Sequence, residues 1–178
     1  MAESGGMKKN WSSPVHFSSN SLSCRLMQYY SRSIEIAADQ EVVYRFHTDP
    51  ANLIRITPPG TKVRILEHGA PGEGVEIILR IRPYPFISQK WHMRFEEFDP
   101  PRRLTDVMLS GPFRRWKQTR EFVPLCNGHT LLNDSVEYEL PFGTLGRLAH
   151  RLFLARHIEQ LFTYRQQVTK KLLENHSA

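Results

Sequence analysis

The sequence has few of the residues that build covalent or metal-bound frameworks. Among its 178 residues only Cys24 and Cys126 are cysteines, the first in a predicted tail and the second in a predicted turn. This placement predicts no disulfide framework and favours a reducing compartment, so we expect a cytoplasmic protein. No Cys-x-x-Cys or His-x-x-x-His spacing occurs, so the sequence predicts no metal site, and nothing in it calls for a cofactor.

Long hydrophobic runs are also missing. No stretch approaches the roughly 18 apolar residues that a transmembrane helix needs. The 40% apolar and 24% charged residues are typical of a soluble globular protein with one sizeable core. The net charge of +6 comes from scattered basic residues without a nucleic-acid-binding motif. We therefore expect no nucleic-acid partner, although a basic surface leaves open a weak contact with a membrane surface.

Residues 1–26 differ in composition from the rest of the chain. They are rich in serine, contain no acidic residue after Glu3 and show no apolar period. Such a segment cannot bury enough apolar surface to fold alone, so we expect a disordered N-terminal extension. Two alternatives stay open: a transit peptide, and a natural beginning near Met27. Residues 27–178 are expected to form a single domain.

The middle of the chain alternates between apolar and polar residues. Asp39 is a suitable N-cap for a short helix over 40–46, and Pro50 suits the first position of a second one. Turn sequences rich in proline, glycine and asparagine separate the alternating segments, which indicates an antiparallel meander. The segments predicted as strands are 31–37, 62–67, 74–82, 87–98, 103–109, 113–124 and 130–140.

A long amphipathic helix is predicted near the end of the chain, from about residue 144 to about residue 173. Its apolar face comprises Leu148, Leu152, Ala155, Phe162, Thr169 and Leu173. A sheet of this many strands must curl, and the helix is long enough to cross it. The predicted fold is therefore α+β of the helix-grip type, in which a curled antiparallel sheet of about seven strands wraps around a long C-terminal helix. Two short helices follow its first strand.

Four local motifs resemble one group of proteins. They are the helix start Asp49-Pro50-Ala51-Asn52-Leu53, the Thr57-Pro58 pair, the strand start Gly111-Pro112-Phe113-x-x-Trp116, and the hinge that runs from Asp134 to Gly146. With the order of elements, these motifs resemble the START-like superfamily, also called the SRPBCC or birch-pollen-allergen fold. The chain is most similar to its bacterial ligand-binding, or polyketide cyclase/dehydrase-like, branch over about residues 27–173.

The resemblance implies a deep apolar cavity between the sheet and the helices. Relatives bind lipids, sterols, polyketides or quinones, and a minority catalyse cyclisation or dehydration. Members of this branch usually carry two histidines at alternate positions after the tryptophan, where this sequence has Gln118 and Arg120. Acid–base chemistry by those histidines is therefore not expected here, and no catalytic residue can be assigned.

Six residues are predicted to contact a ligand. Alternation places Trp116, Gln118 and Arg120 on one face of a strand, and a turn at 126–128 would bring Arg120 close to Asp134. Such a pair could orient a polar head group, or it could be purely structural. Trp91, Trp116 and Tyr138 could line the cavity, or they could be ordinary core aromatics.

The favoured function is binding or transport of a hydrophobic small molecule such as a lipid, quinone or polyketide. One alternative is a cyclase or dehydratase in which Arg120, Asp134 and Tyr138 polarise a carbonyl group and move a proton. That alternative needs a raised pKa at Asp134, and the neighbouring arginine would lower it. A second alternative is an interaction module that docks its basic C-terminal helix on an acidic partner or an anionic membrane.

Overall fold

The computed structural model describes residues 27–141 and 153–175. The predicted N-terminal extension, residues 142–146 of the predicted hinge and the predicted first part of the long helix lie outside these residues. The described elements are β1 (Met27–Ile36), α1 (Gln40–Thr48), α2 (Pro50–Arg55), β2 (Lys62–His68), β3 (Glu76–Tyr84), β4 (Ile87–Asp99), β5 (Arg103–Ser110), β6 (Arg115–Pro124), β7 (Thr130–Glu139) and α4 (Ala155–Glu174).

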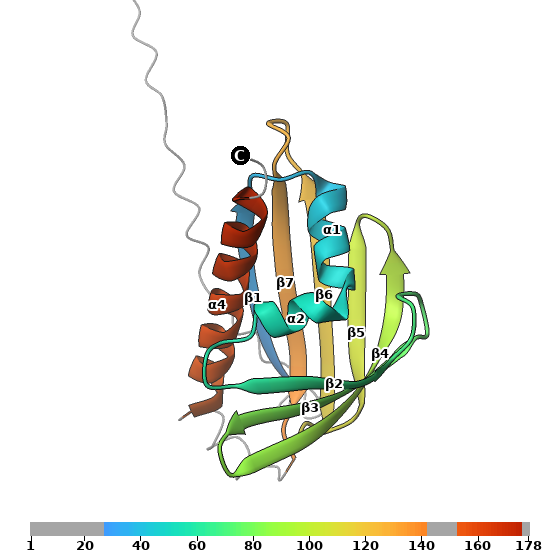
Figure 1. Cartoon of the computed structure of the whole chain (residues 1–178), viewed down its shortest axis with the longest axis vertical. Coiled ribbons are helices and arrows are strands. Elements are labelled where there is room, and N and C mark those ends of the chain that lie inside the picture. Colours follow the sequence, from blue (N-terminus) through green and yellow to red (C-terminus); the bar gives the residue numbers. More distant parts are fainter. Residues whose placement is uncertain (1–26, 142–152, 176–178) are drawn as a thin grey trace, which may run out of the picture.

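The seven strands form one antiparallel sheet in the order β1-β7-β6-β5-β4-β3-β2. Consecutive strands from β2 to β7 are neighbours, and β1 pairs with β7 because α1 and α2 carry the chain from one edge of the sheet to the other. Irregular register in the β2–β3, β3–β4 and β4–β5 pairs adds twist. The sheet consequently curls, and β2 and β3 run across the β1–β7–β6 part (Figure 1).

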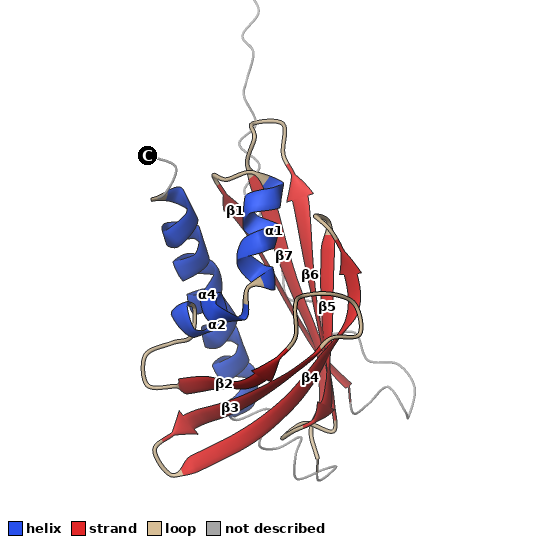
Figure 2. Cartoon of the chain, turned by 45° about the vertical axis from the view of Figure 1, so that its right-hand side comes forward, coloured by secondary structure: helices blue, strands red, loops and turns tan. Residues whose placement is uncertain are grey.

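All three described helices lie on the concave side of the sheet (Figure 2). Asp39 caps α1, since its Oδ1 accepts a hydrogen bond from the Glu41 backbone N–H at 2.8 Å. Asp49 caps α2 in the same way through Ala51 N–H at 2.9 Å, with Pro50 as the first helical residue. The curled seven-stranded sheet, the two short helices and the C-terminal helix confirm the predicted helix-grip architecture.

Helix α4 turns a mixed face towards the sheet. Phe162, Thr169 and Leu173 are buried as predicted. Ile158 and Gln166 are also buried, although neither belongs to the predicted apolar face. Two polar side chains in five is unusual for the core side of a helix, because each needs a hydrogen-bond partner there. Gln166 finds such a partner in Asp134 of β7.

The core falls into two clusters of buried apolar side chains. The first surrounds α1 and comprises Ile36, Ala38, Val43, Tyr44, Phe46, Ile56, Phe95, Leu104, Phe122, Leu132 and Leu173. The second lies beneath the first half of α4 and comprises Met93, Trp116, Val136, Tyr138, Ile158 and Phe162. Phe122 of the first cluster and Phe162 of the second are each only 1% exposed, so both clusters contain fully buried aromatic rings.

Replacing Phe122 with alanine should lower the free energy of unfolding by about 3–5 kcal/mol, because it removes a fully buried ring and leaves a cavity. Urea unfolding followed by circular dichroism measures the change. The matched control is Phe86→Ala in the β3–β4 turn, where the ring is 99% exposed. We expect the control to change stability by less than about 0.5 kcal/mol. Equal effects of the two substitutions would contradict the assigned core.

Candidate functional site

A cavity of about 590 Å³ lies between the concave face of the sheet and the three helices. Its wall is mainly apolar, with side chains from β2, β3, β4, β5, β6, α1, α2 and α4. A volume in this range suits a small organic ligand. The sheet supplies apolar residues at alternate positions, among them Ile77, Leu79 and Ile81 of β3.

Four of the six predicted contact residues line the cavity: Trp91, Trp116, Gln118 and Arg120. Trp91 and Trp116 are also in edge contact, with ring centroids 5.6 Å apart. The other two, Asp134 and Tyr138, are not among the lining residues. Both are buried, at 4% and 2% exposure, behind the cavity wall. Contact of any of the six with a ligand stays a prediction.

Arg120 lies between two buried carboxylates. Its Nη1 donates a hydrogen bond to Asp106 Oδ1 at 2.9 Å, and its Nε lies 3.7 Å from Asp134 Oδ1. The pairing with Asp134 follows from the register of β6 and β7, in which the two residues are direct cross-strand partners. Proximity of Arg120 and Asp134 was predicted, whereas the shorter contact with Asp106 was not.

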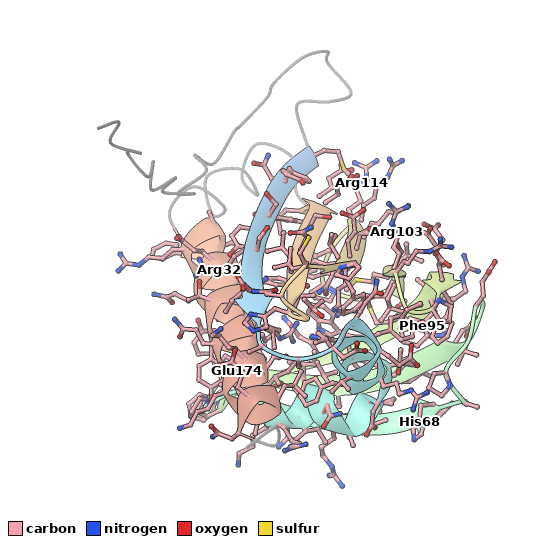
Figure 3. The ribbon with its side chains drawn as sticks, turned by 90° about the horizontal axis from the view of Figure 1, so that it is seen from above. Arg32, His68, Phe95, Arg103, Arg114 and Glu174 are labelled. Carbon is pink, nitrogen blue, oxygen red and sulfur yellow. The ribbon has the colours of Figure 1, made fainter. Side chains whose placement is uncertain are left out.

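Asp134 is held by two glutamines as well. Its Oδ1 accepts from Gln118 Nε2 at 3.3 Å, and its Oδ2 accepts from Gln166 Nε2 at 2.8 Å. Gln166 Nε2 also donates to the backbone carbonyl of Arg32 at 3.0 Å. Arg32 lies where β1 meets α4 (Figure 3). Gln118 therefore has a structural partner within the cluster.

Burial raises the pKa of both aspartates, and the charge of Arg120 opposes the rise. From the sequence we expected the neighbouring arginine to lower the pKa of Asp134. The structure corrects this, because burial is the larger effect. Burial alone also raises the pKa of the Tyr138 phenol.

Two lining residues near this cluster were missed from the sequence: His47 of α1 and Arg165 of α4. Burial, followed by the charges of Arg120 and Arg165, holds the pKa of His47 well below its usual value of 6.5. Burial lowers the pKa of Arg165 to about 10, so this guanidinium remains charged at neutral pH. A signal was available, since His47 is four residues after Val43 and Arg165 is three after Phe162, both core residues.

His92 and His129 are partly exposed and outside the cavity wall, and each has a carboxylate partner. His92 Nε2 lies 2.6 Å from Glu76 Oε2, and His129 Nδ1 lies 2.8 Å from Glu35 Oε1. His157 is exposed at the rim of the cavity. His150 lies outside the described residues.

Among the described residues, no group of three or more His, Cys, Asp or Glu side chains could hold a metal ion. None of the described helices is long and apolar enough to cross a membrane.

With the cavity and its charged cluster defined, comparison with known proteins identifies the family. A model of the family described as polyketide cyclase / dehydrase and lipid transport matches residues 27–174. The chain belongs to this family. The assignment confirms the START-like resemblance and covers every described element. A comparison with curated proteins gives no match.

Solved structures agree on the fold. The Zhui aromatase/cyclase from Streptomyces sp. R1128 is 19% identical with a TM-score of 0.69, over 85% of this chain and 96% of its own. A START superfamily protein from Mycobacterium smegmatis is 16% identical with a TM-score of 0.62, over 83% of this chain and 97% of its own. Ara h 8.0201 is 9% identical with a TM-score of 0.61, over 84% of this chain and 99% of its own. At these identities the likeness shows the fold alone.

Replacing Arg120 with alanine should lower the free energy of unfolding at neutral pH by about 3–5 kcal/mol, because two buried carboxylates lose their shared counter-charge. The folded-state pKa of Asp106 and Asp134 then rises further above the unfolded value of 3.8. A raised carboxyl pKa means that stability falls as pH rises from 3.8 through the folded-state pKa. The deficit should therefore shrink as the pH is lowered, as urea unfolding at several pH values would show.

The control for this prediction is Arg103→Ala on the adjacent strand. Arg103 pairs with Glu97 and Glu121 on the exposed face, with 44% of its side chain accessible. An exposed pair contributes at most about 1 kcal/mol, so we expect a small loss. A deficit for Arg120→Ala that is the same at every pH would contradict a role for the buried aspartates.

Proposed function

We propose that the chain binds a mainly apolar small molecule, of the lipid, quinone or polyketide kind, inside the cavity. The observation that carries this proposal is the composition of the wall, which is apolar over most of its surface and includes a charged cluster around Arg120. Ligand sites commonly have this composition, since apolar area supplies affinity and a few polar groups fix orientation. The family's description, which includes lipid transport, supports the same function.

Trp91, Trp116 and Phe113 would contact the body of the ligand. Phe113 and Trp116 pack with centroids 4.8 Å apart, so these rings form a continuous apolar surface on the cavity wall. Gln118 and Arg120 would face its polar end. Asp134 and Tyr138 would act from behind the wall by holding Gln118, Arg120 and Trp116 in place.

Leu161→Trp tests this function by filling the cavity from α4, because Leu161 lines it and is only partly buried. Titration with the neutral fluorophore N-phenyl-1-naphthylamine should show binding to the wild type. We expect the variant to bind about tenfold more weakly or worse, since apolar contact area is lost and tryptophan occupies its place. Leu66→Trp is the matched control, because Leu66 is exposed and does not line the cavity.

Absence of probe binding to the wild type would overturn the proposed function. Equal binding by Leu161→Trp and the wild type would place the ligand elsewhere, which also contradicts it.

A dehydratase is a second candidate, favoured by one observation. Asp106 lines the cavity, and burial raises the pKa of its carboxyl group. In such a reaction Asp106 would donate its proton to a hydroxyl group that leaves as water. The resulting carboxylate would then take a proton from the carbon next to the carbonyl group. Asp106, and not Asp134, would therefore be the acid, because Asp134 lies behind the wall.

Asp106→Asn should lower the rate of water loss from a β-hydroxyketone probe by about 10²–10⁴-fold, because the amide cannot supply the proton. Product formation followed by mass spectrometry measures the effect, and fluorophore binding checks that the cavity survives. Asp99→Asn, at a partly exposed position outside the cavity wall, is the control. Equal rates for Asp106→Asn and the wild type would exclude this role.

A further inference from the structure

The charged cluster contains two arginines but only one of them has carboxylate partners. Arg120 forms ion pairs with both Asp106 and Asp134. Arg165 makes no ion pair and no hydrogen bond with any residue in the described parts of the chain. Its guanidinium carbon lies over an aromatic ring, 5.7 Å from the centroid of Phe162.

The isolation of Arg165 is physically costly. Its Nε is shielded from solvent and has no hydrogen-bond partner among the described residues, although the side chain lines the cavity. A cation in such a position costs several kcal/mol unless a counter-charge reaches it. The aspartates act on Arg165 only through space, and their raised pKa shows that burial also disfavours their negative charge. Both aspartates are paired with Arg120, so Arg165 is the charged side chain of this cluster that has no direct partner among the described residues.

A second nitrogen without a partner belongs to the same wall. His47 Nε2 is buried and makes no hydrogen bond with the described residues, and His47 lines the cavity too. The charges of Arg120 and Arg165 both lower the pKa of His47, which places its ring near the two guanidinium groups. His47 is neutral, so it can donate a hydrogen bond through Nε2–H without adding charge.

We propose that Arg165 and His47 receive the carboxylate head group of an otherwise apolar ligand, a fatty or aromatic acid. This inference rests on the proposed binding function and names the ligand class. A carboxylate can accept two parallel hydrogen bonds from a guanidinium and has lone pairs left for an imidazole N–H. A neutral ketone or alcohol would leave Arg165 without an ion-pair partner, and a pure hydrocarbon would leave it without a hydrogen-bond acceptor as well.

The test compares two ligands that differ only in the head group. Dodecanoate and methyl dodecanoate, kept below micellar concentrations at neutral pH, compete with N-phenyl-1-naphthylamine for the cavity. The wild type should bind the carboxylate about tenfold or more tightly than the ester, because hydrogen bonds to charged groups contribute more than neutral ones. Arg165→Gln should lose this preference while its affinity for the ester stays within about twofold.

Two further variants separate a specific head-group site from general effects. Arg156→Gln removes a positive charge from an exposed position of the same helix that does not line the cavity, and should keep the preference. Arg165→Lys keeps the charge but lacks the paired N–H donors of a guanidinium. It should therefore restore part of the preference that Arg165→Gln loses. Ester binding by Arg165→Gln, together with its circular dichroism spectrum, shows that the variant is folded.

The outcomes distinguish this inference from the function on which it depends. Equal affinity of the wild type for acid and ester, or an unchanged preference in Arg165→Gln, would overturn the carboxylate site and leave apolar binding intact. If neither ligand displaces the fluorophore and the fluorophore itself does not bind, the proposed function and the inference both fail. Loss of the preference in Arg156→Gln would show that net charge, and not a specific site, causes the preference, and would also overturn the site.

Discussion

The arrangement of the concave face depends on the burial of Arg120 between Asp106 and Asp134. These three residues come from β6, β5 and β7, so their contacts tie together the centre of the sheet. Asp134 extends the connection to α4 through Gln166, and Gln166 extends it to β1 through the Arg32 carbonyl. A buried charge is tolerated only when its partners are fixed, and therefore the cluster sets where the helix lies over the sheet.

The same constraint explains why the cavity can coexist with a charged interior. Gln118, Arg120 and the two aspartates pair with one another, which offsets the cost of burying them beside an apolar wall. The cluster also divides the interior into two apolar regions, one around α1 and one beneath the start of α4. Trp91 and Trp116 belong to the second region. The polar part of the wall and its aromatic part are therefore adjacent on β6, with Trp116 and Arg120 four residues apart.

Properties that depend on neighbours along the chain could be predicted from the sequence. Alternation located the strands, and the turn at 126–128 was enough to bring Arg120 opposite Asp134, because a β-hairpin register follows from its turn. Asp106, His47 and Arg165 could not be placed in this way. They come from β5, α1 and α4, and only the curl of the sheet and the rotation of the helix bring them to one cavity.

The pKa of Asp134 shows a related limit of sequence reasoning. The neighbouring arginine could be inferred, but the depth of burial that outweighs it is a property of the assembled fold. Gln166 is a similar case, since a polar residue on a helix is expected at the surface until its buried partner is known. Both residues became interpretable only when the strand and the helix were seen together.

The two proposed functions, binding and dehydration, would use one charged cluster, and a bound acid would couple them. A carboxylate beside Arg165 would bring a negative charge near Asp106, and a like charge raises the pKa of a carboxyl group. Arg165 now acts on Asp106 in the opposite direction, since its positive charge lowers that pKa. An acidic ligand that neutralises Arg165 would thus leave Asp106 more readily protonated. The head group that pairs with Arg165 would then also favour the protonated acid that the second proposed function needs.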